Sequence, residues 1–212
     1  MKAIVPAVLS ADPNELRVMV GVLNEITSYA QVDFMDGDFV PSKSVEPVDL
    51  VNAEPEFAIE AHLMAHDPMS YLNTLSKTKV EKVIFHFSAV SDPVVVIEKI
   101  REKGLLVGLA INPTISVNEI LPLVDLVDSL LVLSVHPGYY GKSFISETFE
   151  KIGELREKEP GLIIGVDGGI KLDNAKSIIE AGANYICIGS AILKAADPGR
   201  AMDDFTKIIQ RA

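Results

Sequence analysis

The sequence has little of what suits a chain to membranes, nucleic acid or an oxidising compartment. It contains one cysteine, Cys187, so no disulfide can form within the chain, which is typical of a reducing compartment. Basic residues are few: 19 lysines and arginines stand against 30 aspartates and glutamates, giving a net charge of -11. Binding to nucleic acid or to anionic lipid needs basic patches, so we expect neither partner. No run of about 18 apolar residues is present, so no membrane helix is expected.

The N-terminal sequence MKAIVP lacks the apolar region and the cleavage site of a signal peptide, so the expected location is the cytoplasm. Hydrophobic residues make up 48% of the 212 positions, which is enough to bury a sizeable core. No linker, repeat or low-complexity segment divides the chain. We therefore predict one domain over residues 1–212.

Apolar segments alternate along the chain with segments of helical periodicity. The apolar segments are mostly continuous, as in strands that are buried on both faces. The predicted strands are 3–9, 31–35, 57–64, 79–87, 105–111, 128–135, 162–166 and 185–188. The predicted helices are 13–26, 48–51, 68–75, one from Pro93, 116–123, 146–158, 172–180 and 201–209. Asp-Pro pairs precede several of them and are typical helix starts.

This order and number of elements predict an α/β fold, a closed parallel (β/α)8 barrel of the TIM type. An open doubly wound sheet is the alternative. It is disfavoured because the first strand-to-helix turn lacks the glycine-rich loop of dinucleotide-binding folds.

The segment from Gln31 to Pro41 predicts a buried strand that ends in an acidic, turn-forming loop. Successive side chains of a strand point to opposite faces, so Gln31, Asp33 and Met35 share one face. A buried carboxylate is costly unless it is paired, protonated or bound to a metal. Asp33 is therefore a candidate functional residue, and the alternative is an ordinary aspartate on a solvated edge strand.

Polar residues recur at the carboxyl ends of the predicted strands. In a barrel these ends meet at one rim, where the active site is built. Each residue alone has a structural explanation, but their convergence favours a binding or catalytic site. They are Ser10, Asp33, Asp36, His62, His86, Asn112, Ser134, His136, Asp167 and Ser190.

Two glycine-containing pairs follow the last two predicted strands: Gly168-Gly169 and Gly189-Ser190. This is the usual phosphate-binding place in such barrels. Backbone N–H groups and helix N-termini there bind a dianion without a lysine. The alternative is two ordinary tight turns.

The loop after the sixth strand carries Gly138 and Gly141, which favour a hinged lid over a static surface loop. Lys142 follows directly. It is either a lid residue that reaches the phosphate or a solvated loop charge, and its sequence context does not decide between the two.

Short motifs mark the ends of most predicted strands. They are Leu-Ser-Ala-Asp12, Val-Asp-Phe-Met-Asp-Gly-Asp-Phe-Val-Pro41, His-Leu-Met64, Ala-Ile-Asn-Pro113, Ser-Val-His-Pro-Gly138, Val-Asp-Gly-Gly169 and Gly-Ser-Ala-Ile192. In their order and placement they resemble the ribulose-phosphate 3-epimerase family over nearly the whole chain. The family fold is a (β/α)8 barrel, which agrees with the independent prediction.

The resemblance implies interconversion of D-ribulose 5-phosphate and D-xylulose 5-phosphate, which differ in configuration at C3. Asp33 matches the family's proton-transfer residue on one face of the sugar, and Asp167 matches the residue on the opposite face. The intermediate is an enediolate, so negative charge develops on the C2 oxygen. The resemblance also implies a homo-oligomer whose small-molecule partner is a sugar phosphate.

In the family a divalent metal, commonly zinc, stabilises the charge on the C2 oxygen as a Lewis acid. The positions that match its ligands are Gln31, Asp33, His62 and Asp167. Met35 and Met64 match methionines that wall the reacting carbons, and Ser10 matches a substrate contact.

The chain departs from the family most clearly at Gln31, where the family has a histidine ligand. An amide oxygen ligates hard cations but is a poorer zinc ligand than imidazole. Three alternatives stay open: zinc binds weakly through three ligands; magnesium, manganese or iron replaces it; or no metal binds and Gln31 hydrogen-bonds the enediolate oxygen. The other departures are Leu133 for methionine, Lys142 for glutamine and Ser42 for asparagine.

The motifs favour a ketose-phosphate 3-epimerase. The main alternative is a catalytically altered or inactive phosphosugar-binding homologue without the usual metal. A phosphosugar lyase or decarboxylase is disfavoured, because the third strand, Glu60-Ala-His-Leu-Met-Ala65, lacks the lysine of those enzymes.

Overall fold

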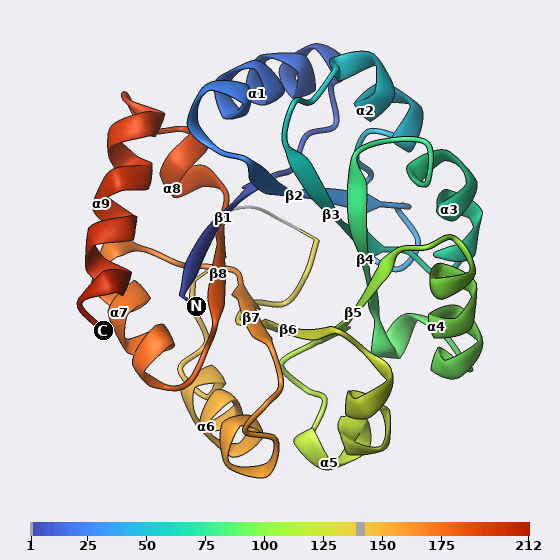
Figure 1. Cartoon of the computed structure of the whole chain (residues 1–212), viewed down its shortest axis with the longest axis vertical. Helices are drawn as coiled ribbons and strands as arrows, with labels where there is room; N and C mark the ends of the chain where they lie inside the picture. Colours follow the sequence, from blue (N-terminus) through green and yellow to red (C-terminus); the bar gives the residue numbers. More distant parts are fainter. Residues whose placement is uncertain (1, 139–142) are drawn as a thin grey trace.

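The computed structural model describes residues 2–138 and 143–212 and forms a closed barrel of parallel strands in sequence order (Figure 1). Each strand pairs with the next, and β8 closes the barrel by pairing with β1. The predicted (β/α)8 barrel is confirmed. The strands are β1 (Ala3–Val8), β2 (Tyr29–Met35), β3 (Ala58–Met64), β4 (Val80–His86), β5 (Leu106–Ile111), β6 (Ser129–Leu133), β7 (Ile164–Asp167) and β8 (Tyr185–Ile188).

Helices form an outer layer around the barrel (Figure 1). Within the described ranges, none of them is long and apolar enough to cross a membrane. The α-helices are α1 (Pro13–Ile26), α2 (Pro47–Ala53), α3 (Met69–Leu75), α4 (Pro93–Glu102), α5 (Val117–Ile120), α6 (Thr148–Lys158), α7 (Leu172–Glu180), α8 (Ser190–Leu193) and α9 (Pro198–Gln210), and the 3-10 segments are η1 (Phe87–Ala89) and η2 (Leu121–Leu126).

The Asp-Pro pairs begin helices largely as predicted. Asp12 caps α1 by accepting a hydrogen bond from the backbone N–H of Asn14, and Asp92 caps α4 in the same way. At α3 the prediction is off by one residue, because Pro68 occupies the N-cap and Asp67 lies outside the helix. Asp67 still accepts a hydrogen bond from the backbone N–H of Ser70 at 3.3 Å.

Near the C-terminus one predicted helix boundary is wrong and one short helix was missed. Helix α9 begins at Pro198 rather than at residue 201, because the Asp197 side chain accepts from the backbone N–H of Arg200 at 2.9 Å and caps the first turn. The short helix α8 was not predicted, since four residues are too few for a periodic pattern. It directly follows β8 and therefore shapes the barrel rim.

Two layers of apolar side chains hold the fold together. The larger layer lies between strands and helices and includes the fully buried Phe34 and Phe85. The smaller layer fills the barrel interior and includes Leu131, Tyr185 and Cys187. Gly165 of β7 is needed there, because a Cβ at this position would overlap the Tyr185 ring.

A buried ion pair lies within the barrel below the rim. Register places Glu60 of β3 beside Lys82 of β4, and Lys82 Nζ lies 2.7 Å from Glu60 Oε2. Tyr29 donates to the same oxygen at 3.2 Å, and Cys187 Sγ lies 3.6 Å from Glu60 Oε1. Burial, reinforced by the charge of Glu60, raises the pKa of Tyr29 and of Tyr185, so both phenols stay protonated.

Candidate active site

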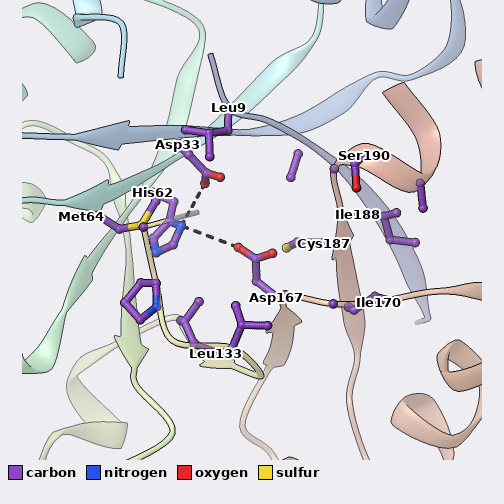
Figure 2. Close-up of a pocket in the computed structure, with 18 of the residues that line it drawn as sticks. Leu9, Asp33, His62, Met64, Leu133, Asp167, Ile170, Cys187, Ile188 and Ser190 are labelled. Atoms are coloured by element: carbon purple, nitrogen blue, oxygen red, sulfur yellow. Dashed lines mark hydrogen bonds and ion pairs between the residues drawn. The ribbon is translucent and has the colours of Figure 1, made fainter. Parts of the chain in front are cut away.

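A cavity of about 380 Å³ opens at the carboxyl ends of the strands. Figure 2 shows Asp33, His62 and Asp167 pointing into it from three different strands. Predicted site residues that line it are Asp33, His62, Met64, Gly138, Asp167, Gly168, Gly169, Gly189 and Ser190. Of the ten strand-end polar residues, Asp33, His62, Asp167 and Ser190 line this one cavity.

Asp33 is buried, with 7% of its surface exposed, so the solvated-edge alternative is wrong. The register of β2 and β3 places it directly beside His62, and its Oδ1 lies 2.9 Å from His62 Nδ1. A carboxylate at this depth needs such a partner. Strand pairing, which the sequence alone does not specify, supplies it.

Asp167 reaches the same imidazole from β7, across the barrel. Its Oδ2 lies 3.8 Å from His62 Nδ1 (Figure 2). Burial and the charge of Asp33 raise the pKa of Asp167 to about 7, although His62 and Gln31 oppose this shift. Burial alone would lower the pKa of His62, but its hydrogen bond to Asp33 and the two carboxylate charges raise it. His62 and Asp167 therefore tend to stay protonated at higher pH than an ordinary histidine and an ordinary aspartate.

Gln31 lies one inward-facing position below Asp33 on β2 and is fully buried. Its Nε2 donates to Asp33 Oδ1 at 2.8 Å and to Asp167 Oδ2 at 2.9 Å. One amide thus bridges the two carboxylates from beneath and fixes their relative position.

His86 stands behind His62 and is fully buried. The two Nε2 atoms lie 2.9 Å apart and the rings stack with centroids 5.0 Å apart. Burial and the charge of His62 lower the pKa of His86, and the interaction with the Asn112 side chain opposes them only in part, so His86 is neutral. When His62 is neutral and donates from Nδ1 to Asp33, His86 donates to its Nε2; when His62 is protonated, its Nε2 donates to His86, and either bond orients the His62 ring. The sequence placed His86 at a strand end but did not indicate this contact.

The donor atoms of Asp33, His62 and Asp167 all lie within 4.8 Å of one another. Two carboxylate oxygens and one imidazole nitrogen form a mixed donor set that suits a divalent metal ion. The residues present therefore fit the kind of metal that the sequence predicts.

The far end of the cavity is formed by backbone. Gly168 and Gly169 have φ values of 111° and 61°, in the left-handed region that favours glycine. A Cβ on Gly168 would also overlap the Val135 side chain. The Ser134 hydroxyl donates to the backbone oxygen of Asp167 at 2.9 Å and also contacts that of Gly168, which holds the turn in place.

Some predicted site residues lie beside this cavity or outside the described ranges. Ser10 donates to Glu15 Oε2 at 2.6 Å and, with Met35, lines an adjoining, more open hollow. Met35 packs against Met64 at the barrel mouth. His136 is exposed. Gly141 and Lys142 lie outside the residues that the structure describes.

Other residues that line the cavity were not predicted. Cys187, which the sequence places in an apolar run, is buried and also lines the cavity. Its inward position two residues before Gly189 was the signal that would have shown this. The remaining ones are Ala7, Leu9, Val135, Pro137, Ile170, Lys171, Ile188 and Ala191. Leu133, which stands in place of a family methionine, also lines the cavity.

The raised pKa of Asp167 predicts a pH-dependent stability in chelator-treated protein. Its pKa in the folded state, about 7, lies above its ordinary value of 3.8, so the folded state binds this proton more tightly. The contribution of Asp167 to the free energy of unfolding is therefore highest at low pH, where Asp167 is protonated in both states, and it falls as the pH rises towards 7. The stability advantage of Asp167→Asn over the native chain should grow by roughly 1–3 kcal/mol between about pH 5 and pH 8, measured by urea denaturation. A constant difference would contradict the shift.

Comparison with known proteins gives concordant results. Residues 3–193 match the model of the ribulose-phosphate 3 epimerase family. A ribulose-phosphate 3-epimerase of Schizosaccharomyces pombe is 34% identical over 99% of this chain and 94% of its own length. A cytoplasmic isoform of that enzyme from Oryza sativa subsp. japonica is 32% identical over 98% of this chain and 94% of its own.

Among solved structures, 3-hexulose-6-phosphate synthase from Salmonella typhimurium superposes with a TM-score of 0.70 over 100% of this chain and 99% of its own, at 16% identity. At that identity the likeness supports the barrel fold alone. The family match extends over most of the chain, and the curated relatives match over nearly all of it. The chain therefore belongs to the ribulose-phosphate 3 epimerase family.

Proposed function

We propose that the protein inverts C3 of a ketose phosphate and interconverts D-ribulose 5-phosphate and D-xylulose 5-phosphate. The observation that carries this proposal is the placement of Asp33 and Asp167. They reach one cavity from β2 and β7, on different sides of the barrel, and both contact His62 and Gln31. A sugar held between them would present one face to each carboxylate.

In this proposal one aspartate removes the proton from C3 and the other delivers a proton to the opposite face. The hydrogen at C3 is adjacent to the C2 carbonyl, so its loss gives an enediolate. Closely spaced carboxylates favour sharing one proton, which leaves one residue as base and the other as acid. A pKa of about 7 for Asp167 suits proton transfer near neutral pH.

Asp33, His62 and Asp167 would hold the divalent metal, with His86 orienting His62 from behind. When bound, the metal supplies Lewis-acid stabilisation of negative charge on the C2 oxygen. Met64 lines the cavity and packs against Met35, and together they would wall the reacting carbons from water.

The phosphate of the substrate would bind the backbone N–H groups of the turns after β7 and β8, at Gly168-Gly169 and Gly189-Ser190. Both turns line the cavity. Ser190 in one of them and Ile170 beside the other lie at the end away from His62 (Figure 2). Backbone N–H groups gathered at such turns bind anions without a cationic side chain. This position would place the sugar carbons between the two aspartates.

The substitution Gly168→Ala is expected to weaken substrate binding. Its φ of 111° is strained for alanine, and the added methyl group would overlap Val135, so the turn must move. KM should rise roughly tenfold to a hundredfold, as for a misplaced hydrogen bond to a charged group. The matched control is Gly153→Ala in α6, where an added Cβ meets nothing within 4 Å. Equal KM values for both variants would contradict the phosphate assignment.

The function is tested by incubating the protein with D-ribulose 5-phosphate and following D-xylulose 5-phosphate by NMR. The protein is used as purified, and after chelation with zinc, manganese, magnesium or iron restored singly. We expect turnover in at least one metal condition. Thermal stabilisation by the sugar phosphate without turnover in any condition would instead favour a phosphosugar-binding protein.

A further inference from the structure

The Gln31 amide is oriented so that only one of its two polar atoms is used. Its Nε2 donates to both carboxylates, at 2.8 and 2.9 Å. Its Oε1 is buried and has no hydrogen-bond partner among the residues that the structure describes. Buried acceptors are rarely left unpaired, and each exception calls for an explanation such as an ion. The unused oxygen is therefore available as a ligand.

The oxygens that accept from Gln31 belong to the predicted metal donors. Asp33 Oδ1 and Asp167 Oδ2 are also the atoms that lie 2.9 and 3.8 Å from His62 Nδ1. An N–H donor and a cation cannot both occupy the space that these oxygens face, because the amide hydrogens carry positive charge. A cation that binds these two oxygens from the side that Gln31 faces must therefore displace the amide hydrogens.

Rotation of the amide by half a turn resolves this conflict. It exchanges Nε2 and Oε1 in nearly the same volume, and the last side-chain torsion of glutamine is broad and roughly two-fold. The rotation removes two hydrogen bonds and turns the unpartnered oxygen towards the carboxylates. The donor set then consists of three oxygens and one imidazole nitrogen.

We propose that Gln31 completes the metal centre through Oε1 after this rotation, and that its amide oxygen lowers the centre's preference for zinc over Mn²⁺. The inference rests on the metal site of the proposed function. Amide and carboxylate oxygens suit hard cations such as Mn²⁺ and Mg²⁺, whereas imidazole favours zinc. The rotation also costs the two hydrogen bonds to the carboxylates, so binding of every cation is weaker than in a centre with a preformed fourth ligand.

The first test compares the native chain with Gln31→His by calorimetric titration of chelator-stripped protein. We expect the histidine to raise zinc affinity by roughly tenfold or more, and Mn²⁺ affinity by less than about threefold. A zinc-to-Mn²⁺ affinity ratio that is the same in both proteins would overturn the proposal, as would the absence of binding to the native chain. No substrate is used, so either result is independent of whether the protein is an epimerase.

The second test needs no substitution. The chain has two glutamines, Gln31 and Gln210, so selective ¹⁵N labelling of glutamine side chains gives two carboxamide signals. Gln210 is exposed at the end of α9 and serves as the internal control. Saturation with zinc, and separately with Mg²⁺, should shift the Gln31 signals and leave those of Gln210 in place. Metal binding without any change in the Gln31 signals would show that its oxygen is not a ligand.

Discussion

Replacement of Asp167 by asparagine is expected to lower kcat for C3 epimerisation by roughly 10³-fold or more, because it would remove one of the two proposed proton-transfer groups. Asparagine keeps the shape of the side chain but carries no transferable proton. Asp33→Asn should have an effect of the same order, since each face of the sugar needs its own proton-transfer group. Both variants are measured by NMR with D-ribulose 5-phosphate under the metal condition that gives turnover.

The two variants also differ in a way that a folding defect cannot produce. Each keeps one aspartate, so each should still exchange the C3 proton of one epimer with D₂O, and the two variants should prefer opposite epimers. Asp203→Asn, at an exposed position of α9, is the matched control and should keep full activity. Residual epimerisation above about a tenth of the native rate in either active-site variant would contradict the two-aspartate mechanism.

Lys82→Met is expected to lower the free energy of unfolding by about 3–5 kcal/mol, the usual cost of breaking a buried ion pair on one side. Glu60 is fully buried, and Lys82 Nζ lies 2.7 Å from its Oε2. Methionine has a similar length but no charge, so the Glu60 carboxylate would lose its counterion inside the barrel. Urea denaturation of both proteins measures the loss, provided that the m value is the same in the native chain and the variant.

Two further variants test the cause of this loss. Adding Glu60→Gln to Lys82→Met removes the unpaired charge and should recover much of the stability. The exposed pair of Lys99 and Glu102, 2.8 Å apart, provides the control, because Lys99→Met should cost less than about 1 kcal/mol. Equal losses in Lys82→Met and Lys99→Met would show that the buried pair does not stabilise the barrel.

The fold could be predicted from the sequence because strand and helix signals alternate without interruption. The site followed from the same pattern: once the strands are taken as parallel, their carboxyl ends must share a rim, which brings Asp33, His62 and Asp167 together. The period of two also placed Gln31 on the inward face with Asp33. These inferences need only the order and direction of the strands.

Contacts across the barrel could not be predicted in the same way. The pairing of Glu60 with Lys82, and the stacking of His62 on His86, depend on the register of adjacent strands. The alternation of side chains along a strand fixes the face of the sheet to which a residue points. It does not fix which residue of the adjacent strand lies beside it. The bridge from Gln31 to Asp167 depends in addition on barrel width and strand tilt.

The measurement that tests the central claim most directly is the isotopic content of C3 early in the reaction in D₂O. With Asp33 and Asp167 on opposite faces, D-xylulose 5-phosphate should form with deuterium at C3 while unreacted D-ribulose 5-phosphate keeps its original hydrogen. Product that retains the substrate's own hydrogen at C3 would mean that a single group carries the proton between faces, and would contradict the account.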